Sequence, residues 1–234
     1  NPLELFQIWL NLPAEDKMAE PHFAMLWSDL IPRRSFTDAE GRVTNVAVVA
    51  GRLGDAVAPP PPPRSWASRP DSDVAIWTLK LAPHARFTVP AAKGDKTRRT
   101  LYLFVGSSLT VAGRELRQHA AVEVRAQDDV ELVNGEHETE LLLLQGRPIG
   151  QPVTQYGPFV MNTQQQIQQA MMDYRRTRFG GWPYPDDAPT HGRESRRFAK
   201  HADGKLEEKS SVVSRQSSVE SSPEKSASLV SPDD

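Results

Sequence analysis

Residues 98–144 carry the pattern that decides the fold: RRTLYLFVGSSLTVAGRELRQHAAVEVRAQDDVELVNGEHETELLLL. Short runs of β-branched, aromatic and leucine residues repeat through this stretch, and residues that favour turns separate them. We expect strands at residues 98–105, 108–112, 119–125, 128–133 and 138–144. The turn signals between them lie at Gly106–Ser107, Ala112–Gly113, Gln127–Asp129 and Asn134–Gly135, and Asn-Gly is the strongest short-hairpin signal of the set.

Two further strands are expected upstream, at residues 43–50 and 74–81, and the second ends at the turn Ala82-Pro83-His84. Between them, Pro59–Pro63 forms a polyproline II segment that cannot occupy a central strand. No alternation of strands and helices is present. The sequence therefore predicts an all-β fold, a jelly-roll β-barrel of antiparallel strands across residues 40–160.

One α-helix is expected after the barrel. Thr163 and Gln166 have the spacing of a capping box, and Gly180–Gly181 lies beyond the last turn. Apolar residues recur at helical spacing along one face, at Ile167, Ala170, Met171 and Tyr174. The helix and its closing loop span residues 161–183.

Composition excludes several classes of protein. The 234 residues have a formal net charge of -2, which favours neither direct nucleic-acid binding nor an anionic membrane. No apolar stretch approaches the roughly 20 residues of a membrane span, and the absence of cysteine excludes disulfides and thiolate ligands. Residues 184–234 are rich in Ser and charged residues, so we expect a disordered tail. A cytoplasmic and/or nuclear location fits these features.

The first residues indicate a piece of a larger protein. The chain begins at Asn1 without Met and passes almost at once into an apolar, strand-like run, Leu5–Leu10. Residues 1–39 are therefore interpreted as a segment that leaves a preceding domain, followed by a linker with Pro13 and Pro21 at its surface.

Two segments resemble the pirin family of two-cupin proteins. The first is Leu5–Pro13, followed by Asp16–Met18 and Pro21, and it is similar to the segment that crosses from the first cupin to the second. The other is Gln155–Thr163 with the helix to Arg178–Gly180, which resembles the closing loop and C-terminal helix of the family. Similarity covers most of residues 1–183 and includes Gly146–Ile149 and Pro152–Val153.

The resemblance implies that residues 40–160 are the C-terminal cupin of a pirin. Family members bind iron in the N-terminal cupin through three histidines and one glutamate, in a His-x-His and a later His-x-Glu motif. Those motifs would precede Asn1, so no catalytic, cofactor-binding or metal-binding residue is assigned within this chain. The intact protein would be an iron-dependent quercetin 2,3-dioxygenase. Two alternatives remain: a nuclear cofactor that binds transcription factors, and a structural domain that braces the first cupin.

The histidines agree with this assignment on chemical grounds. A non-haem iron site needs imidazoles and a carboxylate that converge on one centre, and the six histidines are scattered without a His-x-His pair. We expect His84 at a turn or barrel rim rather than as a ligand. His119 could point inward beside it. Adjacent strand residues face opposite sides, so His137 and Glu138 cannot both converge, and His137 is expected at a solvated hairpin tip. The others are His22 and, in the tail, His191 and His201.

Charged and proline-rich motifs offer weaker candidates for binding. The cations Lys93, Lys96, Arg98 and Arg99 could form an anion or partner patch, although a solvated loop is the default interpretation. Pro59–Arg64 contains the P-x-x-P-x-R pattern of SH3-type ligands, against a stiff loop as the alternative. The tail holds candidate phosphorylation sites at Arg215–Ser218, Ser222–Pro223 and Ser231–Pro232, and a basic cluster at Arg193, Arg196, Arg197 and Lys200.

Two apolar surfaces have more than one interpretation. One is the N-terminal strip of Phe6, Ile8, Trp9 and Leu10, and the other is the apolar face of the helix. Each either belongs to the core of this domain or forms the surface that the first cupin covers.

Overall fold

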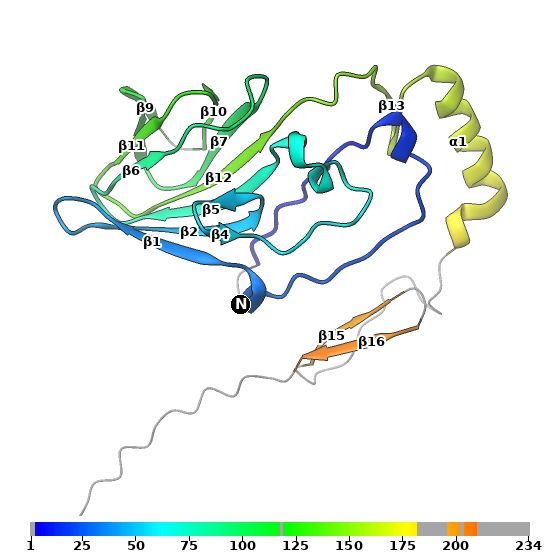
Figure 1. Ribbon diagram of the computed structural model, residues 1–234, viewed down its shortest axis with the longest axis horizontal. Helices are drawn as coiled ribbons and strands as arrows, with labels where there is room; N and C mark the ends of the chain where they lie inside the picture. The colour runs from blue at the N-terminus through cyan, green and yellow to red at the C-terminus, as the bar shows by residue number, and fades with distance from the viewer. Residues whose placement is uncertain (1–2, 118, 182–195, 202–203, 210–234) are drawn as a thin grey trace, which may run out of the picture. The chain divides into compact units, whose positions relative to one another are not determined.

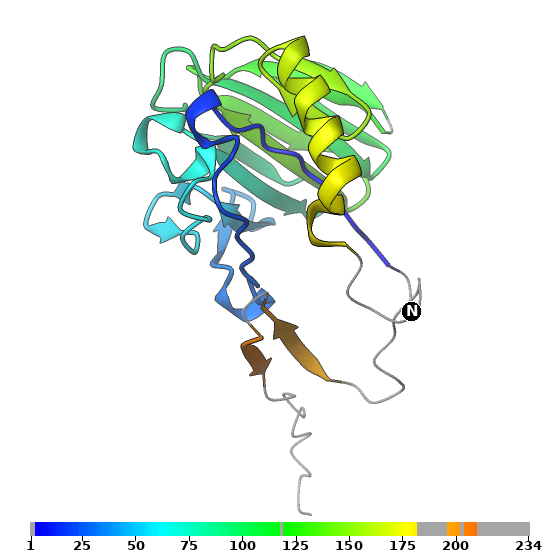
Figure 2. The same cartoon turned by 90° about the vertical axis from the view of Figure 1, so that its right-hand side faces the viewer.

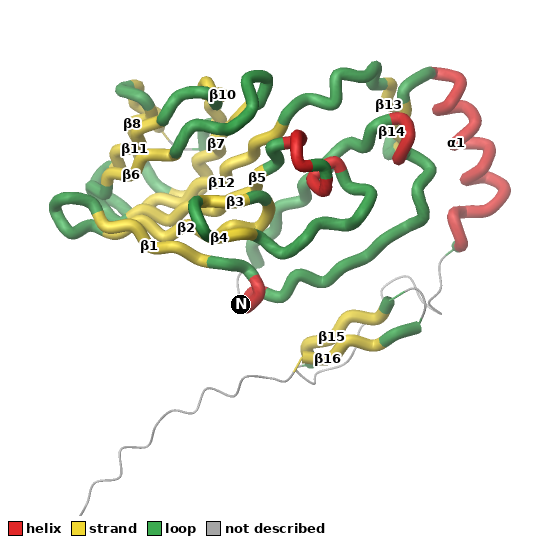
Figure 3. Tube along the Cα trace, viewed as in Figure 1, coloured by secondary structure: helices red, strands yellow, loops and turns green. Residues whose placement is uncertain are grey.

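Two antiparallel sheets form the body of the protein in the computed structural model, which describes residues 3–117, 119–181, 196–201 and 204–209 (Figure 1). The chain divides into two units, Asn1–Tyr184 and Pro185–Asp234. Both sheets belong to the first unit. Figure 3 shows the strands of these two sheets gathered on one side of the unit, with long loops leading to the helix on the other.

The larger sheet has six strands in the order β1-β2-β5-β12-β7-β10. Their bounds are Arg33–Thr37 (β1), Val43–Ala50 (β2), Ala75–Leu81 (β5), Thr139–Gly146 (β12), Arg98–Val105 (β7) and Ala121–Arg125 (β10). The smaller sheet has the order β6-β11-β8-β9. Its strands are Arg86–Val89 (β6), Val130–Asn134 (β11), Ser108–Val111 (β8) and Arg114–Arg117 (β9). From β5 to β12 the chain changes sheet at every connection except β8–β9, which is a jelly-roll arrangement.

The core lies between the inner faces of these two sheets. Alternate residues of each strand point inward, so Leu79, Leu101 and Leu143 of the larger sheet and Leu109 and Leu132 of the smaller one are buried together. Burial of these side chains drives the sheets together. The predicted cupin-type jelly-roll fold with one C-terminal helix is confirmed.

Most predicted strands are present, and two expectations were wrong. Strands β2 and β7 have the predicted bounds, 43–50 and 98–105. The run Leu5–Leu10 is extended but forms no strand, because it pairs with no other strand. Asn134–Gly135 is not a hairpin: β11 lies in the smaller sheet and β12 in the larger one, so these residues connect two sheets.

The buried side chain of Asn134 explains the failed hairpin prediction. Its Nδ2 contacts the carbonyl oxygens of Leu81 (3.1 Å), Ala82 (2.8 Å) and His137 (2.8 Å), while its Oδ1 accepts from the Gly135 N–H at 2.9 Å. Asn134 is thus used to join the sheets rather than to reverse the chain.

A two-residue hairpin does lie at Ala112–Gly113, a predicted turn. Val111 pairs with Arg114, and both turn residues have positive φ, 47° at Ala112 and 80° at Gly113. This is the geometry of a type I′ turn, which matches the twist of the strands that it joins. A positive φ is unfavourable for Ala112, because its Cβ crowds the backbone in this conformation.

The helix and a small hairpin close the first unit. Helix α1 spans Gln164–Thr177 and begins with the predicted capping box of Thr163 and Gln166. It packs on the hairpin of β13 (Thr154–Tyr156) and β14 (Phe159–Met161). Of its predicted apolar face Ile167 is fully buried, whereas Tyr174 is exposed and stacks edge-on with Phe159 and Phe179.

The remaining elements of this unit are short. They are the strands β3 (Arg52–Leu53) and β4 (Ala56–Val57) and the 3₁₀ helices η1 (Ala14–Asp16), η2 (Ser28–Leu30), η3 (Trp66–Ser68), η4 (Pro70–Ser72) and η5 (Arg178–Gly180). None of the helices in the described residues is long and apolar enough to cross a membrane.

The second unit contains an unexpected hairpin of β15 (Arg197–Lys200) and β16 (Leu206–Lys209). Arg196 forms an ion pair with Glu208, and His201 Nε2 lies 3.3 Å from Glu207 Oε2. The composition of the region gave no sign of these strands. Arg193, His191 and the candidate phosphorylation sites between Arg215 and Pro232 lie outside the described residues.

Candidate functional site

The histidines of the barrel lie on its surface. His84 is exposed at a turn with φ 60°, and its backbone N–H donates to the Gly135 carbonyl at 2.8 Å. His137 is exposed in the β11–β12 connection, and His119 is exposed beside β10 with φ 41°. The turn position of His84 and the solvated position of His137 are confirmed, although the latter is not a hairpin tip. The inward orientation considered for His119 is wrong.

These positions do not fit the iron site that the fold family implies. Three imidazoles and a carboxylate must converge on one centre, and within the described ranges no group of three or more His, Cys, Asp or Glu side chains could hold a metal ion. The expectation that this chain binds no iron remains a prediction for metal analysis.

A network of buried polar groups lies at one end of the barrel core. Arg99, only 1% exposed, donates from Nε (2.9 Å) and Nη2 (2.6 Å) to Oε1 of Gln145, and from Nη2 to the Pro90 carbonyl at 2.9 Å. Gln145 is held in turn, since its Nε2 donates to the Asp73 carbonyl at 3.0 Å. The network lines a cavity of about 510 Å³ where β5 and β7 begin and β12 ends. We call this end of the barrel the mouth.

The electrostatics of Arg99 are unusual for a buried cation. Burial lowers the pKa of its guanidinium, while the charges of Asp73 and Asp129 act in the opposite direction. Asp73 is already engaged, because its Oδ2 accepts from Thr97 Oγ1 (2.7 Å) and the Gly94 N–H (3.1 Å). None of the salt bridges found among the described residues includes Arg99.

Arg99 was predicted as one of four cations in a solvated loop, and this was wrong. Lys93, Lys96 and Arg98 are exposed, but Arg99 lies inside the barrel. Strand alternation was the signal that could have found it, because Arg99 shares a face with Leu101 and Leu103, whereas Arg98 faces solvent. The structure therefore does not gather the four cations into one patch.

The N-terminal segment covers the outer face of the larger sheet (Figure 2). Phe6 packs edge-on against Phe104 of β7 with ring centroids 4.8 Å apart. Phe6 and Ile8 are 38% and 37% exposed, whereas Leu5 and Trp9 are 77% and 63% exposed. None of Phe6, Ile8, Trp9 and Leu10 belongs to the buried core, so the core interpretation of this strip was wrong. Its interpretation as a surface that the first cupin covers stays a prediction. We call Leu3, Leu5 and Trp9 the outer strip.

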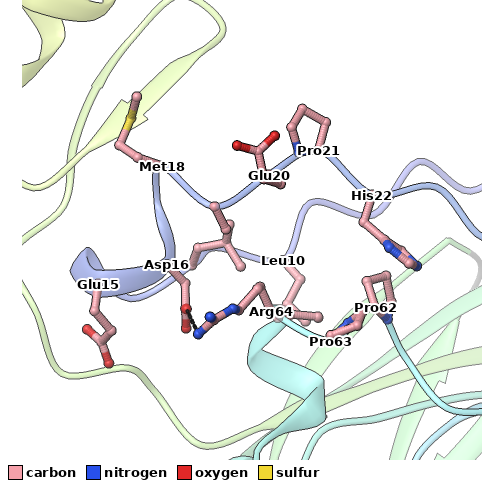
Figure 4. Close-up of a pocket in the computed structure, with 13 residues that line it drawn as sticks. Leu10, Glu15, Asp16, Met18, Glu20, Pro21, His22, Pro62, Pro63 and Arg64 are labelled. Atoms are coloured by element: carbon pink, nitrogen blue, oxygen red, sulfur yellow. Dashed lines mark hydrogen bonds and ion pairs between the residues drawn. The ribbon is translucent and has the colours of Figure 1, made fainter. Parts of the chain in front are cut away.

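The proline-rich segment packs beside residues 10–22. Figure 4 shows Pro62, Pro63 and Arg64 at the edge of a cavity of about 690 Å³ that Leu10 also lines. Arg64 forms an ion pair with the buried carboxylate of Asp16 at 3.4 Å, and Arg69 contacts the same carboxylate at 2.7 Å. The arginine of the P-x-x-P-x-R pattern is therefore engaged within the chain.

Comparison with known proteins agrees with the architecture. Residues 76–180 match the family model described as the Pirin C-terminal cupin domain. A putative quercetin 2,3-dioxygenase of Pseudomonas aeruginosa, PA2418, is 32% identical over 178 residues, which are 76% of this chain and 57% of that protein. Pirin of Homo sapiens is 30% identical over 185 residues, or 76% of this chain and 58% of that protein.

A solved structure shows the same arrangement. Quercetin 2,3-dioxygenase from Acinetobacter baumannii superposes with a TM-score of 0.61 at 26% identity, covering 74% of this chain and 56% of that one. The chain thus spans somewhat more than half the length of the curated relatives that it matches.

Proposed function

This chain carries the C-terminal cupin domain of the pirin family, and from that premise we propose that it is the non-catalytic domain of an iron-dependent oxidoreductase of the quercetin 2,3-dioxygenase class. Its function in that protein is to dock on the N-terminal cupin that holds the metal. The names of its relatives support the activity of the whole protein, and the outer strip supports the docking.

The outer strip is the observation that carries the proposal. Extended residues without a strand partner do not normally expose several large apolar side chains on one side, because such surface is costly in water. Here the opposite side is already held by the sheet through Phe6 and Phe104. The segment is therefore anchored on its own domain and presents Leu5 and Trp9 to a partner. The partner with the matching chemistry is an apolar face of a second cupin.

The iron would be held by the other cupin, since the described histidines of this chain do not converge. When bound, the iron supplies the redox chemistry of dioxygen. No residue described here is given a part in that chemistry.

Metal analysis and a quercetin assay test the catalytic half of the proposal. The purified chain is loaded with Fe²⁺, desalted and assayed for iron content and for loss of quercetin absorbance, beside the Acinetobacter baumannii enzyme as a positive control. We expect substoichiometric iron and no turnover from this chain. Stoichiometric iron or quercetin consumption would contradict the assignment of the metal to another domain.

A binding experiment tests the docking half. The sequence encoded before Asn1 is read for a His-x-His pair and a later His-x-Glu pair, and that domain is produced separately. We expect it to bind the chain in analytical ultracentrifugation, and the double variant L5S/W9S to bind at least tenfold more weakly. Gln7→Ser, in the same exposed segment, is the matched control. Absence of the histidine motifs, or equal binding by L5S/W9S, would count against the proposal.

A further inference from the structure

The connection between β11 and β12 contains Asn134-Gly135, the dipeptide of this chain that is most prone to deamidation. In an unfolded peptide the backbone nitrogen after an asparagine can attack the side-chain Cγ, expel ammonia and close a five-membered succinimide ring. Water then opens the ring to aspartate or isoaspartate. Glycine favours the reaction because it has no Cβ beside the attacking nitrogen and its backbone turns freely. The other asparagines of the sequence precede Pro2, Leu12, Val46 and Thr163.

The barrel uses both residues of this dipeptide. The Asn134 amide nitrogen is the donor shared by three backbone carbonyl groups, which belong to Leu81, Ala82 and His137. A side chain at position 135 would collide with the Ser108 hydroxyl and lie 3.1 Å from the Ser108 carbonyl oxygen, so the close packing there favours glycine. The Asn-Gly pair therefore has a structural reason, and its chemical lability comes with it.

The folded geometry opposes the ring closure at each step. The attacking nitrogen must lose its proton and turn its lone pair towards Cγ, but the Gly135 N–H donates to Asn134 Oδ1 at 2.9 Å and to the Ser108 carbonyl at 3.3 Å. The departing Nδ2 needs a proton, and its three hydrogen-bond partners are carbonyl oxygens, which have none to give. Asn134 is only 4% exposed, so water has little access to it.

The products of the reaction do not suit the same position. Deamidation replaces the donor Nδ2 with a carboxylate oxygen, which would face the same three carbonyl oxygens without a hydrogen to share. Burial of a negative charge among acceptors is strongly unfavourable. Isoaspartate also adds an atom to the main chain between β11 and β12, which belong to different sheets. Either product would therefore weaken the junction between the two sheets.

From this chemistry and geometry we propose that Asn134 is a deamidation site that the folded barrel protects, and that its reaction in the unfolded chain leaves a product that folds less stably. The reaction consumes water, releases ammonia and needs no cofactor. Time spent unfolded is thereby converted into a lasting covalent change, which makes unfolding progressively irreversible. The inference is independent of the iron and of the docking surface proposed above.

Peptide mass spectrometry tests the protection. The purified chain is held at mildly alkaline pH, either in buffer or in enough guanidinium chloride to unfold it, and samples taken over several days are digested with trypsin. We expect the Asn134 amide to be converted at least about tenfold more slowly in buffer than in denaturant, because only the opened population reacts. Equal rates in the two solutions, or no conversion in denaturant, would overturn the proposal.

Asn162 is the matched control within the same sample. Trypsin does not cleave before Pro148, so Asn134 and Asn162 lie on one peptide, residues 126–175, and fragmentation of that peptide distinguishes them. In denaturant we expect Asn162 to react at least about tenfold more slowly than Asn134, because the branched Cβ of Thr163 hinders the attacking nitrogen. Similar rates at the two asparagines would show that Gly135 does not set the lability, contrary to the proposal.

A variant tests the effect of the product on the fold. Asn134→Asp supplies one product directly, without ageing or refolding, and we expect it to unfold at a lower urea concentration than the wild type or to be recovered unfolded. Asn45→Asp makes the same chemical change at an exposed position of β2 and should keep the wild-type midpoint. A wild-type midpoint for Asn134→Asp would contradict the second part of the proposal, whatever the rates of deamidation.

Discussion

Two buried polar side chains, Asn134 and Arg99, lie at opposite ends of the same barrel and differ in how completely they are hydrogen-bonded. Asn134 lies where β5 ends and β12 begins, and both its amide nitrogen and its oxygen have backbone partners. Arg99 lies at the mouth, where β5 begins and β12 ends, and keeps one nitrogen without a partner in the described residues. The difference separates a buried side chain whose donor and acceptor atoms are both used by the fold from one that is buried with a donor unused.

The end of the barrel that holds Asn134 also contains an unpaired polar atom, so the comparison concerns the two side chains and not the two ends as a whole. Thr44, which pairs with Leu81 near Asn134, also has a buried hydroxyl without a partner among the described residues. A neutral hydroxyl costs far less to bury than a guanidinium does. Arg99 is therefore the group whose burial most needs an explanation.

The largest effect is expected from Asn134→Ala. The change leaves the carbonyls of Leu81, Ala82 and His137 without their shared donor, which should lower the free energy of unfolding by about 2–4 kcal/mol. Urea denaturation at pH 7 measures this loss. Asn45→Ala, on an exposed position of β2, is the control and should change stability by less than about 0.5 kcal/mol. Similar losses of stability in the two variants would contradict the role of Asn134 in holding the fold together.

The next effect depends on pH and concerns Asp38, which lies at the same end as Asn134. Burial raises the pKa of this carboxyl, but hydrogen bonds from the backbone N–H groups of Arg42 and Arg86 and from the Arg42 side chain outweigh it, holding the pKa at about 2 against an ordinary 3.8. The stabilisation is therefore present above about pH 3.8 and is lost as pH falls towards 2.

Asp38→Asn should remove that pH dependence. We expect the variant to be less stable than the wild type at pH 7 and to lose less stability between pH 4 and pH 2, as measured by thermal denaturation across this range. Parallel curves for the two proteins would show that Asp38 does not tie β1–β2 to β6.

Arg99→Met should have a smaller effect on stability than Asn134→Ala. Methionine has a side chain of similar length and removes the cost of burying a cation, but it leaves the acceptors of Gln145 and Pro90 without their donor beside the cavity. We therefore expect the free energy of unfolding to change by no more than about 1 kcal/mol in either direction. Urea denaturation at pH 7 is the measurement. A loss as large as that of Asn134→Ala would place Arg99 among the groups that serve the fold.

The smallest effect is expected at the β8–β9 turn. Ala112 has a positive φ, a conformation that Asn tolerates better than Ala, so Ala112→Asn should raise stability by about 0.5 kcal/mol. Ala112→Val, with a β-branched side chain, should do the opposite. Melting temperatures of the two variants relative to the wild type test the assignment, and a lower value for Ala112→Asn would contradict it.

The sequence predicted the strands well and their partners less well. Residues 43–50 and 98–105 were recognised because an apolar, β-branched pattern depends on local preferences alone. Strands β1 and β6 were missed, since both are rich in polar residues and lie close to prolines. The role of Asn134–Gly135 could not be read locally, because the same dipeptide suits a tight hairpin and a turn between sheets.

The candidate site was harder to predict for a similar reason. Arg98 and Arg99 are identical neighbours in the sequence, and only the alternation along β7, in which Arg99 shares a face with Leu101 and Leu103, places one in solvent and the other in the core. The unpaired indole nitrogen of Trp77 among the described residues depends on its surroundings and leaves no trace in composition. The lack of a His-x-His pair, by contrast, is visible directly in the sequence.

The position of β12 between β5 and β7 has a consequence for synthesis of the chain. Strands β5 and β7 emerge from the ribosome before β12. The edge that each of them turns towards β12 stays unpaired until Thr139–Gly146 has been synthesised. Until then the nascent chain carries unfilled backbone donors and acceptors on two apolar strands, a state open to association with other chains. Chaperone protection during translation should therefore end only after Gly146 has left the exit tunnel.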